Sequence, residues 1–94
     1  MKIAGLIWLY DIVEKIAQKH HVQQNEVREV LENRSKFRFV ENGNRPDEDV
    51  YAASGQTNGG RYLIIFFVHK TDDKAVILTA RDMTKAERKR YEEK

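Results

Sequence analysis

Two arginines stand at the ends of the most apolar part of the chain, and together they could bind an anion. Arg61 precedes the apolar run Tyr62–Val68, and Arg81 follows the apolar run Ala75–Ala80. The polar segment between the runs predicts a β-hairpin. If its turn is centred near Thr71, the arginines become cross-strand neighbours, a like-charge contact that costs about 0.2–1 kcal/mol. A phosphate held between them would remove this cost, because guanidinium groups bind phosphate oxygens in pairs.

Three histidines, His20, His21 and His69, are the other groups that could do chemistry near neutral pH. Their spacing does not follow a metal-ligand pattern such as HExxH, so we predict no metal site. His20 is a candidate general acid or base, because the unperturbed pKa of histidine lies near neutrality. The plainer alternative is that His20 and His21 end a helix, where a cation interacts favourably with the helix dipole.

The composition fits one small globular domain over residues 1–94. Hydrophobic residues make up 40% of the chain and charged residues 34%, and there is no cysteine. A chain without cysteine has neither a disulfide framework nor a thiolate metal site, in agreement with a cytoplasmic location. The apolar run Ile3–Leu9 is too short to span a bilayer and lacks the flanks of a signal peptide.

The charge of the chain is unevenly placed. The net charge is only +2, yet residues 1–50 carry eight Lys/Arg and nine Asp/Glu, whereas residues 51–94 carry nine and six. The basic excess therefore lies with the hairpin and the C-terminal tail. This distribution is compatible with a phosphate-bearing partner and equally with an ordinary solvated surface.

Two helices are expected in the N-terminal third. The first covers Asp11–His20, with Asp11 as N-cap and Glu14 completing a capping box. The second begins after Gln23 and ends at Asn33, and a contact between Val22 and Val27 forms a hydrophobic staple at its start. Both carry an apolar stripe at helical spacing, so we expect them to cover one face of a sheet.

The remaining patterns predict strands and one further helix. Tyr62–Val68 is apolar on both faces, as in a central strand that is covered on two sides. Thr84 and Glu87 form a second capping box, which opens a highly charged and therefore peripheral helix over Lys85–Glu93. The fold class is thus α+β, with an antiparallel or mixed-edge sheet of about four strands. The candidate strands are Lys36–Glu41, Val50–Ser54, Tyr62–Val68 and Ala75–Ala80, with Lys2–Leu9 as a further strand or extended arm.

The order of these parts resembles the BrnT-type toxins of bacterial type II toxin–antitoxin systems. Five segments carry the resemblance, and His21 stands where the family pattern has glycine. The segments are Lys19-His20-His21-Val22, Glu48-Asp49-Val50-Tyr51-Ala52-Ala53-Ser54-Gly55, Gly60-Arg61, Thr79-Ala80-Arg81 and Thr84-Lys85-Ala86-Glu87-Arg88-Lys89-Arg90-Tyr91-Glu92.

The resemblance implies a RelE-like fold and a metal-independent RNA endonuclease without cofactors. Its partners would be RNA and a cognate antitoxin, typically a ribbon-helix-helix protein, in a hetero-oligomer or a homodimer. In this reading the RNA 2′-hydroxyl attacks the adjacent phosphate, with His20 or Glu48 as base. Arg61 and Arg81 would stabilise the transition state. The RNA backbone would contact the C-terminal residues Lys85, Arg88, Arg90 and Tyr91.

A non-enzymatic reading stays open beside this one. A module of the same fold could use its basic face only to bind nucleic acid or an acidic protein. Expression of an endonuclease toxin alone should slow growth, whereas expression of a binding module should be tolerated.

Overall fold

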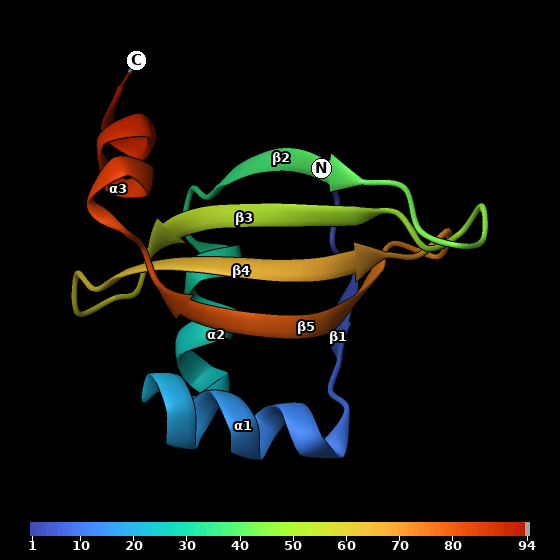
Figure 1. The fold of residues 1–94 in the computed structure, drawn as a ribbon, viewed down its shortest axis with the longest axis horizontal. Helices are drawn as coiled ribbons and strands as arrows, with labels where there is room; N and C mark the ends of the chain where they lie inside the picture. The colour runs from blue at the N-terminus through green and yellow to red at the C-terminus, as the bar shows by residue number, and fades with distance from the viewer. Residues whose placement is uncertain (94) are drawn as a thin grey trace.

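The computed structural model describes residues 1–93, which form five strands and three helices (Figure 1). The elements in chain order are β1 Gly5–Ile7, α1 Tyr10–His20, α2 Gln24–Glu32, β2 Lys36–Glu41, β3 Val50–Gln56, β4 Tyr62–His69, β5 Lys74–Asp82 and α3 Lys85–Glu92. Within residues 1–93, no helix is long and apolar enough to cross a membrane.

The strands form a single mixed sheet in the order β1-β5-β4-β3-β2. The β2, β3, β4 and β5 strands pair antiparallel with their neighbours, as expected. The expectation of about four strands is corrected to five, because the centre of the N-terminal segment, β1, pairs parallel with β5. Only three residues of that segment join the ladder, so most of it is an extended arm.

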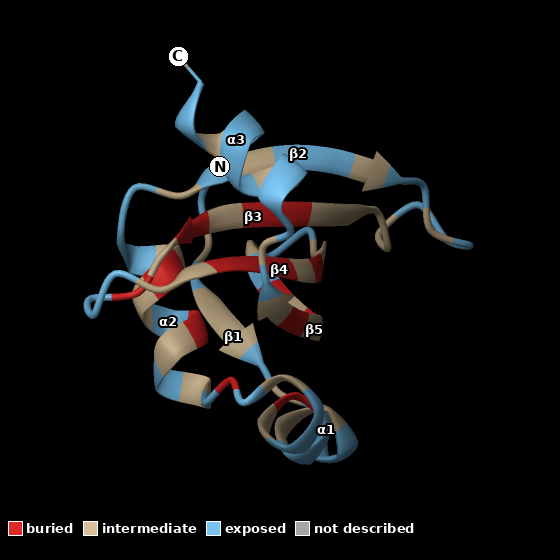
Figure 2. Cartoon of the chain, turned by 60° about the vertical axis from the view of Figure 1, so that its left-hand side comes forward, coloured by how far each residue is buried: buried red, intermediate tan, exposed pale blue. Residues whose placement is uncertain are grey.

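The two N-terminal helices pack on the same face of the sheet, which we call the inner face. In Figure 1, α2 passes behind the central strands and α1 lies below β5, and Figure 2 shows buried positions on the central strands and on both helices. The apolar stripes of the helices meet every second residue of the central strands, as periods of 3.6 and 2 require. The fully buried core residues are Ile16, Val22, Val27, Val30, Ala53, Leu63, Ile65, Phe67, Ala75, Ile77 and Ala80.

Helix ends match the sequence patterns in part. The capping box of α3 is confirmed: Thr84 Oγ1 accepts from the Glu87 N–H at 3.1 Å, and a Glu87 carboxylate oxygen accepts from the Thr84 N–H at 2.8 Å. The prediction that Asp11 is the N-cap of the first helix is wrong, because Leu9 holds that position. Asp11 lies instead in the first turn, where its negative charge still favours the helix dipole.

A β-bulge in the central hairpin decides where the two arginines point. Phe67 pairs with Ile77, but Phe66 pairs with Thr79, so Leu78 is an extra residue. Without this residue, the same register would place Arg81 opposite an inner-face residue. With it, Arg81 pairs with Ile64 on the opposite, outer face, because one inserted residue reverses the side on which every later side chain lies.

The predicted cross-strand contact between Arg61 and Arg81 is therefore wrong. Arg61 reaches acidic and carbonyl oxygens of α1 and α2 on the inner side. Arg81 lies over the ring of Phe66 on the outer side. The arginines stand at the same end of the hairpin but on opposite faces of the sheet, so a single phosphate does not fit between them.

The outer face has little cover within residues 1–93. Only α3 lies against it, at one end, and the rest of the face is open toward the viewer in Figure 1. The expectation that Tyr62–Val68 is covered on both sides is thus wrong for this chain. Phe66 and Val68, which point outward, are only half-buried.

Candidate nucleic-acid interface

A row of polar and basic residues crosses the outer face at the end next to α3. The pairing of neighbouring strands aligns Lys36 with Ser54, Ser54 with Ile64, and Ile64 with Arg81. We call these four residues the cationic row, since a cation stands at each of its ends. Because cross-strand partners share a face, the row presents both charges to the same side of the sheet.

A hollow of about 190 Å³ lies between the cationic row and α3. Arg38, one pleat along β2, and Arg90, from α3, add two further cations to its wall. The hydroxyl of Ser54 is also in the wall and can donate to an anionic oxygen. Three strands and a helix thus bring three cations and a hydroxyl group to one hollow, together with the carboxylate of Glu87, and the excess of cations suits a phosphate-bearing ligand.

The Arg81 guanidinium is paired with a carboxylate of α3. Its two terminal nitrogens donate to the two oxygens of Glu87 at 2.7 and 3.0 Å. The hydrogen bond from Arg81, together with the Thr84 N–H, lowers the pKa of Glu87 from 4.5 to about 2, against the effect of burial. The same contact raises the pKa of Arg81. Glu87 therefore occupies the fork of Arg81 that a phosphate would use.

The predicted RNA-contacting residues of α3 lie in different surroundings. The Tyr91 ring packs edge-on against Tyr62 with centroids 6.0 Å apart, and Lys36 donates to the Tyr91 carbonyl at the end of the helix. Arg88 also stacks on the ring of Tyr62, with its guanidinium carbon 3.9 Å from the ring centroid. Lys85 is exposed, and Arg90 lines the hollow.

Arg61 has a different setting, in which all five of its N–H groups are used within the chain. Its Nε and one Nη donate to the Asp82 carboxylate at 2.8 and 3.1 Å. The remaining donors reach the carbonyls of His21 at 2.6 Å and His20 at 2.8 Å, and the carboxylate of Glu26 at 3.3 Å. The pKa of Asp82 is lowered by its hydrogen bonds from Arg61, and the pKa of Arg61 is raised. Arg61 thus ties α1, α2 and β5 together.

The two predicted bases lie at opposite ends of the sheet. The main chain of His20 contacts Arg61, so this histidine belongs to the end where both arginines stand. Glu48 precedes β3 at the far end, where it faces Arg45 at 3.6 Å. Seven residues of β3 separate Glu48 from the arginine end, which is about 20 Å at the rise of a strand. The structure therefore groups His20 with Arg61 on the helical side of the sheet, apart from Arg81 on the outer face, and leaves Glu48 at the far end.

His21 ends α1 in the left-handed conformation, with φ of 53°. This conformation costs a residue that has a Cβ atom about 1–2 kcal/mol, whereas glycine adopts it freely. We expect His21→Gly to raise the free energy of unfolding by about 0.5–1 kcal/mol, measured by urea denaturation. A matched His69→Gly variant, at a strand position, should lose stability. Unchanged or lower stability of His21→Gly would contradict this view of the helix end.

The contact between Glu87 and Arg81 predicts acid-sensitive stability. Because the pKa of Glu87 is lower in the folded chain, the contact stabilises the fold fully above about pH 4.5 and is lost as the pH falls toward about 2. At neutral pH its value is at most about 3 kcal/mol. We expect Glu87→Gln to be less stable than the parent in thermal melts at pH 7 and equal to it near pH 2. A difference that grows on acidification would contradict the contact.

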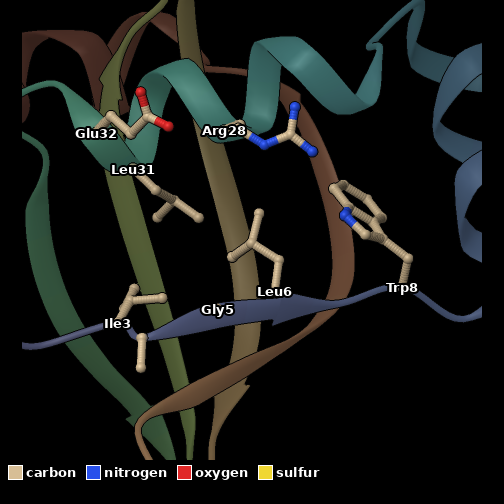
Figure 3. A pocket seen from close by; sticks show the side chains of 8 residues that line it. Ile3, Gly5, Leu6, Trp8, Arg28, Leu31 and Glu32 are labelled. Atoms are coloured by element: carbon tan, nitrogen blue, oxygen red, sulfur yellow. The ribbon is translucent and has the colours of Figure 1, made fainter.

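A second and larger hollow lies on the helical side, between β1 and α2. Its volume is about 330 Å³, and Figure 3 shows Ile3, Leu6, Leu31 and Trp8 around it, with Arg28 and Glu32 on the helix above. Within residues 1–93, the buried Nε1 of Trp8 has no hydrogen-bond partner. The lining combines apolar side chains with the polar atoms of Arg28 and Glu32, so this hollow suits packing of an apolar group with a polar edge better than chemistry on a phosphate.

Sequence reasoning missed three residues of the outer-face hollow: Lys36, Arg38 and Ser54. The alternation of Lys36 and Arg38 with two phenylalanines does predict a half-buried strand with both cations on one face. Their place on the same face as Arg81 depends on the order and register of the strands, which pattern alone does not give.

The fold is similar to that of the ribonuclease toxin BrnT of Brucella abortus. The two structures superpose with a TM-score of 0.62 over 86% of this chain and 97% of the toxin, at 16% sequence identity. The predicted BrnT-like fold is therefore confirmed. No protein-family model matches the sequence, and no curated protein matches it significantly.

Proposed function

We propose that the chain is a metal-independent endoribonuclease that acts as a toxin of a type II toxin–antitoxin system in the cytoplasm. The observation that carries this proposal is the cation-lined hollow on the outer face of a sheet whose fold is shared with a ribonuclease toxin. RNA would lie along the outer face, with its phosphates beside Lys36, Arg38, Arg81 and Arg90. Arg88 and Tyr91 would support α3 beside the strand, and Lys85 would add long-range attraction.

The proposed reaction uses the substrate's own 2′-hydroxyl as nucleophile. The base takes the proton of this hydroxyl, the 2′-oxygen bonds to phosphorus, and the bond from phosphorus to the 5′-oxygen breaks. The products are a 2′,3′-cyclic phosphate and a 5′-hydroxyl, which receives a proton. Arg81 would stabilise the negative charge that develops on the phosphoryl oxygens, once the phosphate has displaced Glu87 from its fork.

Of the two predicted bases we propose His20, which lies at the same end of the sheet as Arg81 although on the helical side, whereas Glu48 lies at the far end. For Arg61 we propose a positioning role in place of the predicted contact with phosphate. Its guanidinium already has acceptors for all five N–H groups, two of which are the main-chain carbonyls of His20 and His21. By holding these carbonyls, Arg61 fixes the end of the helix that carries the proposed base.

Cleavage assays with matched oligonucleotides test this function. The purified chain is incubated in EDTA with an RNA oligonucleotide, and with the same sequence carrying 2′-O-methyl groups throughout. We expect cleavage of the RNA only, with cyclic phosphate at the new 3′ end. Cleavage of the methylated strand, or a requirement for a divalent cation, would exclude attack by the 2′-hydroxyl.

An antitoxin is the proposed protein partner, with a ribbon-helix-helix protein as the expected type. Expression of the chain alone should slow bacterial growth, and co-expression with the product of the neighbouring gene should restore it. Normal growth on expression of folded protein at a high level would speak against a toxin.

A non-catalytic binding module is the second candidate. The specific observation in its favour is that both predicted catalytic arginines are paired with carboxylates of the chain, Arg61 with Glu26 and Asp82, and Arg81 with Glu87. Such a module would bind nucleic acid or an acidic protein through the same basic surface. It would retain RNA in a filter-binding assay in EDTA and leave the RNA intact.

A further inference from the structure

Four aliphatic side chains form a continuous row across the open part of the outer face. The strand register aligns Val50 with Val68, Val68 with Val76, and Val76 with Ile7. We call these four residues the aliphatic row. It crosses four adjacent strands and lies at the end of the sheet away from α3. An open sheet face normally presents polar side chains to water, so this row departs from the usual alternation.

The members of the row remain partly accessible in the isolated chain. Ile7 is 37% exposed, and the three valines are half-buried. Phe66 and Leu78, the bulge residue, extend the apolar surface toward the middle of the face and are also half-buried. A contiguous apolar surface of this kind typically marks a site where another macromolecule binds.

Basic residues border the aliphatic row on the side toward α3, and Lys74 of β5 borders it on the other side. The next row toward α3 begins with Arg38 and continues through Ala52 and Phe66 to Thr79. The cationic row follows and ends at Arg81. The outer face thus carries an apolar row near one end and a cationic row near the other, with a mixed row between them, and Glu41 lies beside Val50 at the β2 end of the apolar row.

We propose that the outer face binds an acidic amphipathic helix of a partner protein. The apolar side of the helix would lie on the aliphatic row, and its acidic residues would face Arg38 and the cationic row. The outer strands of the aliphatic row are about 14 Å apart, which corresponds to about ten residues of helix. Three turns with apolar residues at i, i+3, i+4 and i+7 would therefore cover the row.

The chemistry of the face favours this occupant over two others. A second copy of the chain would bring its own cationic row to the interface, so like charges would lie close together. RNA would find cations at one end, but four aliphatic side chains offer its bases neither hydrogen bonds nor aromatic stacking. An acidic amphipathic helix complements both ends of the face.

This inference rests on the proposed function in one respect, that the partner would be the antitoxin. A helix in this position would cover the hollow where RNA is proposed to bind, so one contact would provide both affinity and inhibition. Binding of the helix itself does not require that the chain cleaves RNA.

A designed peptide tests the docking surface on the full chain. The probe is a 14-residue helix with leucine at the four stripe positions and glutamate at most others, and binding is measured by fluorescence anisotropy. The controls are a peptide of the same composition with a scrambled stripe, and a peptide with lysine in place of glutamate. We expect the probe to bind at least tenfold more tightly than either control.

Variants of the protein locate the site. The double variant Ile7→Ser/Val76→Thr should weaken binding of the probe at least tenfold, and Arg38→Glu should do the same. Phe39→Ser, an exposed apolar side chain on the inner side, and Arg45→Glu, in the loop after β2, are the matched controls and should not change affinity. Circular dichroism melts identify any variant that does not fold, in which case Ile7→Ser alone replaces the double variant.

Three results would overturn the proposal. The probe could bind no better than its scrambled control. Sedimentation could show a dimer that Ile7→Ser/Val76→Thr converts to a monomer, which would assign the face to a second copy. The same variant could weaken RNA binding tenfold without affecting the probe. If the probe binds as expected but RNA is not cleaved, the docking surface stands and the endonuclease function fails.

Discussion

Replacing Arg61 with alanine is expected to lower the free energy of unfolding by about 3 kcal/mol, which corresponds to a fall in melting temperature of roughly 10–20 °C. The Arg61 side chain is only 28% exposed, and its guanidinium bridges Glu26 of α2, Asp82 of β5 and the last carbonyls of α1. Its removal would leave two helix-end carbonyls without their arginine donor, and the partly buried carboxylate of Glu26 with the Gln23 N–H but without its cationic partner. Urea denaturation at pH 7 measures the loss.

Arg61→Lys is the matched control for this prediction. Lysine keeps the charge but has only one nitrogen, so it should restore part of the stability and not all of it. Arg45→Ala, whose side chain is 83% exposed, should change the stability by less than about 0.5 kcal/mol. A fully stable Arg61→Ala variant without RNA cleavage would instead support the direct contact with phosphate expected from the sequence.

Replacing Arg81 with alanine is expected to reduce the rate of RNA cleavage by about 10²–10³-fold, because fixed cations contribute most where charge develops in the transition state. The effect on affinity should be smaller, since Lys36, Arg38 and Arg90 still surround the hollow. Single-turnover cleavage in EDTA, with saturating protein, separates the chemical step from binding.

The stability of this variant requires a control, because Arg81 also anchors α3 through Glu87. The double variant Arg81→Ala/Glu87→Gln removes the unpaired carboxylate and should recover part of the stability without recovering cleavage. Glu87→Gln alone leaves the fork of Arg81 free and should increase the affinity for RNA. Cleavage by Arg81→Ala at the parental rate would exclude the proposed role of Arg81.

The two rows of the outer face make RNA and a protein partner competitors for one surface. A helix on the aliphatic row would extend toward Arg38, and RNA in the hollow would contact the same arginine. Saturating probe peptide should therefore lower RNA binding by the folded chain. A bound helix would thus inhibit RNA cleavage directly, because it occupies residues of the outer face that RNA also needs.

Patterns within the sequence determined the secondary structure and the character of each element. Helical spacing identified the two N-terminal helices, and Thr84 with Glu87 marked the start of the last one. The charged composition of α3 correctly indicated a peripheral helix, on which no residue from Lys85 to Glu92 is buried. These features are predictable because they depend on residues within a few positions of one another.

Only the tertiary structure decided which groups meet. The extra residue Leu78 turned Arg81 to the outer face, and nothing in the pattern of β5 distinguishes a bulge from a regular strand. The acceptors around Arg61 come from three elements far apart in sequence, so its hydrogen bonds depend on how α1, α2 and β5 pack together. The sequence indicated two arginines that could bind an anion. In the folded chain, Arg61 donates all its hydrogen bonds to acceptors of the chain itself, and Arg81 lies on the open face of the sheet.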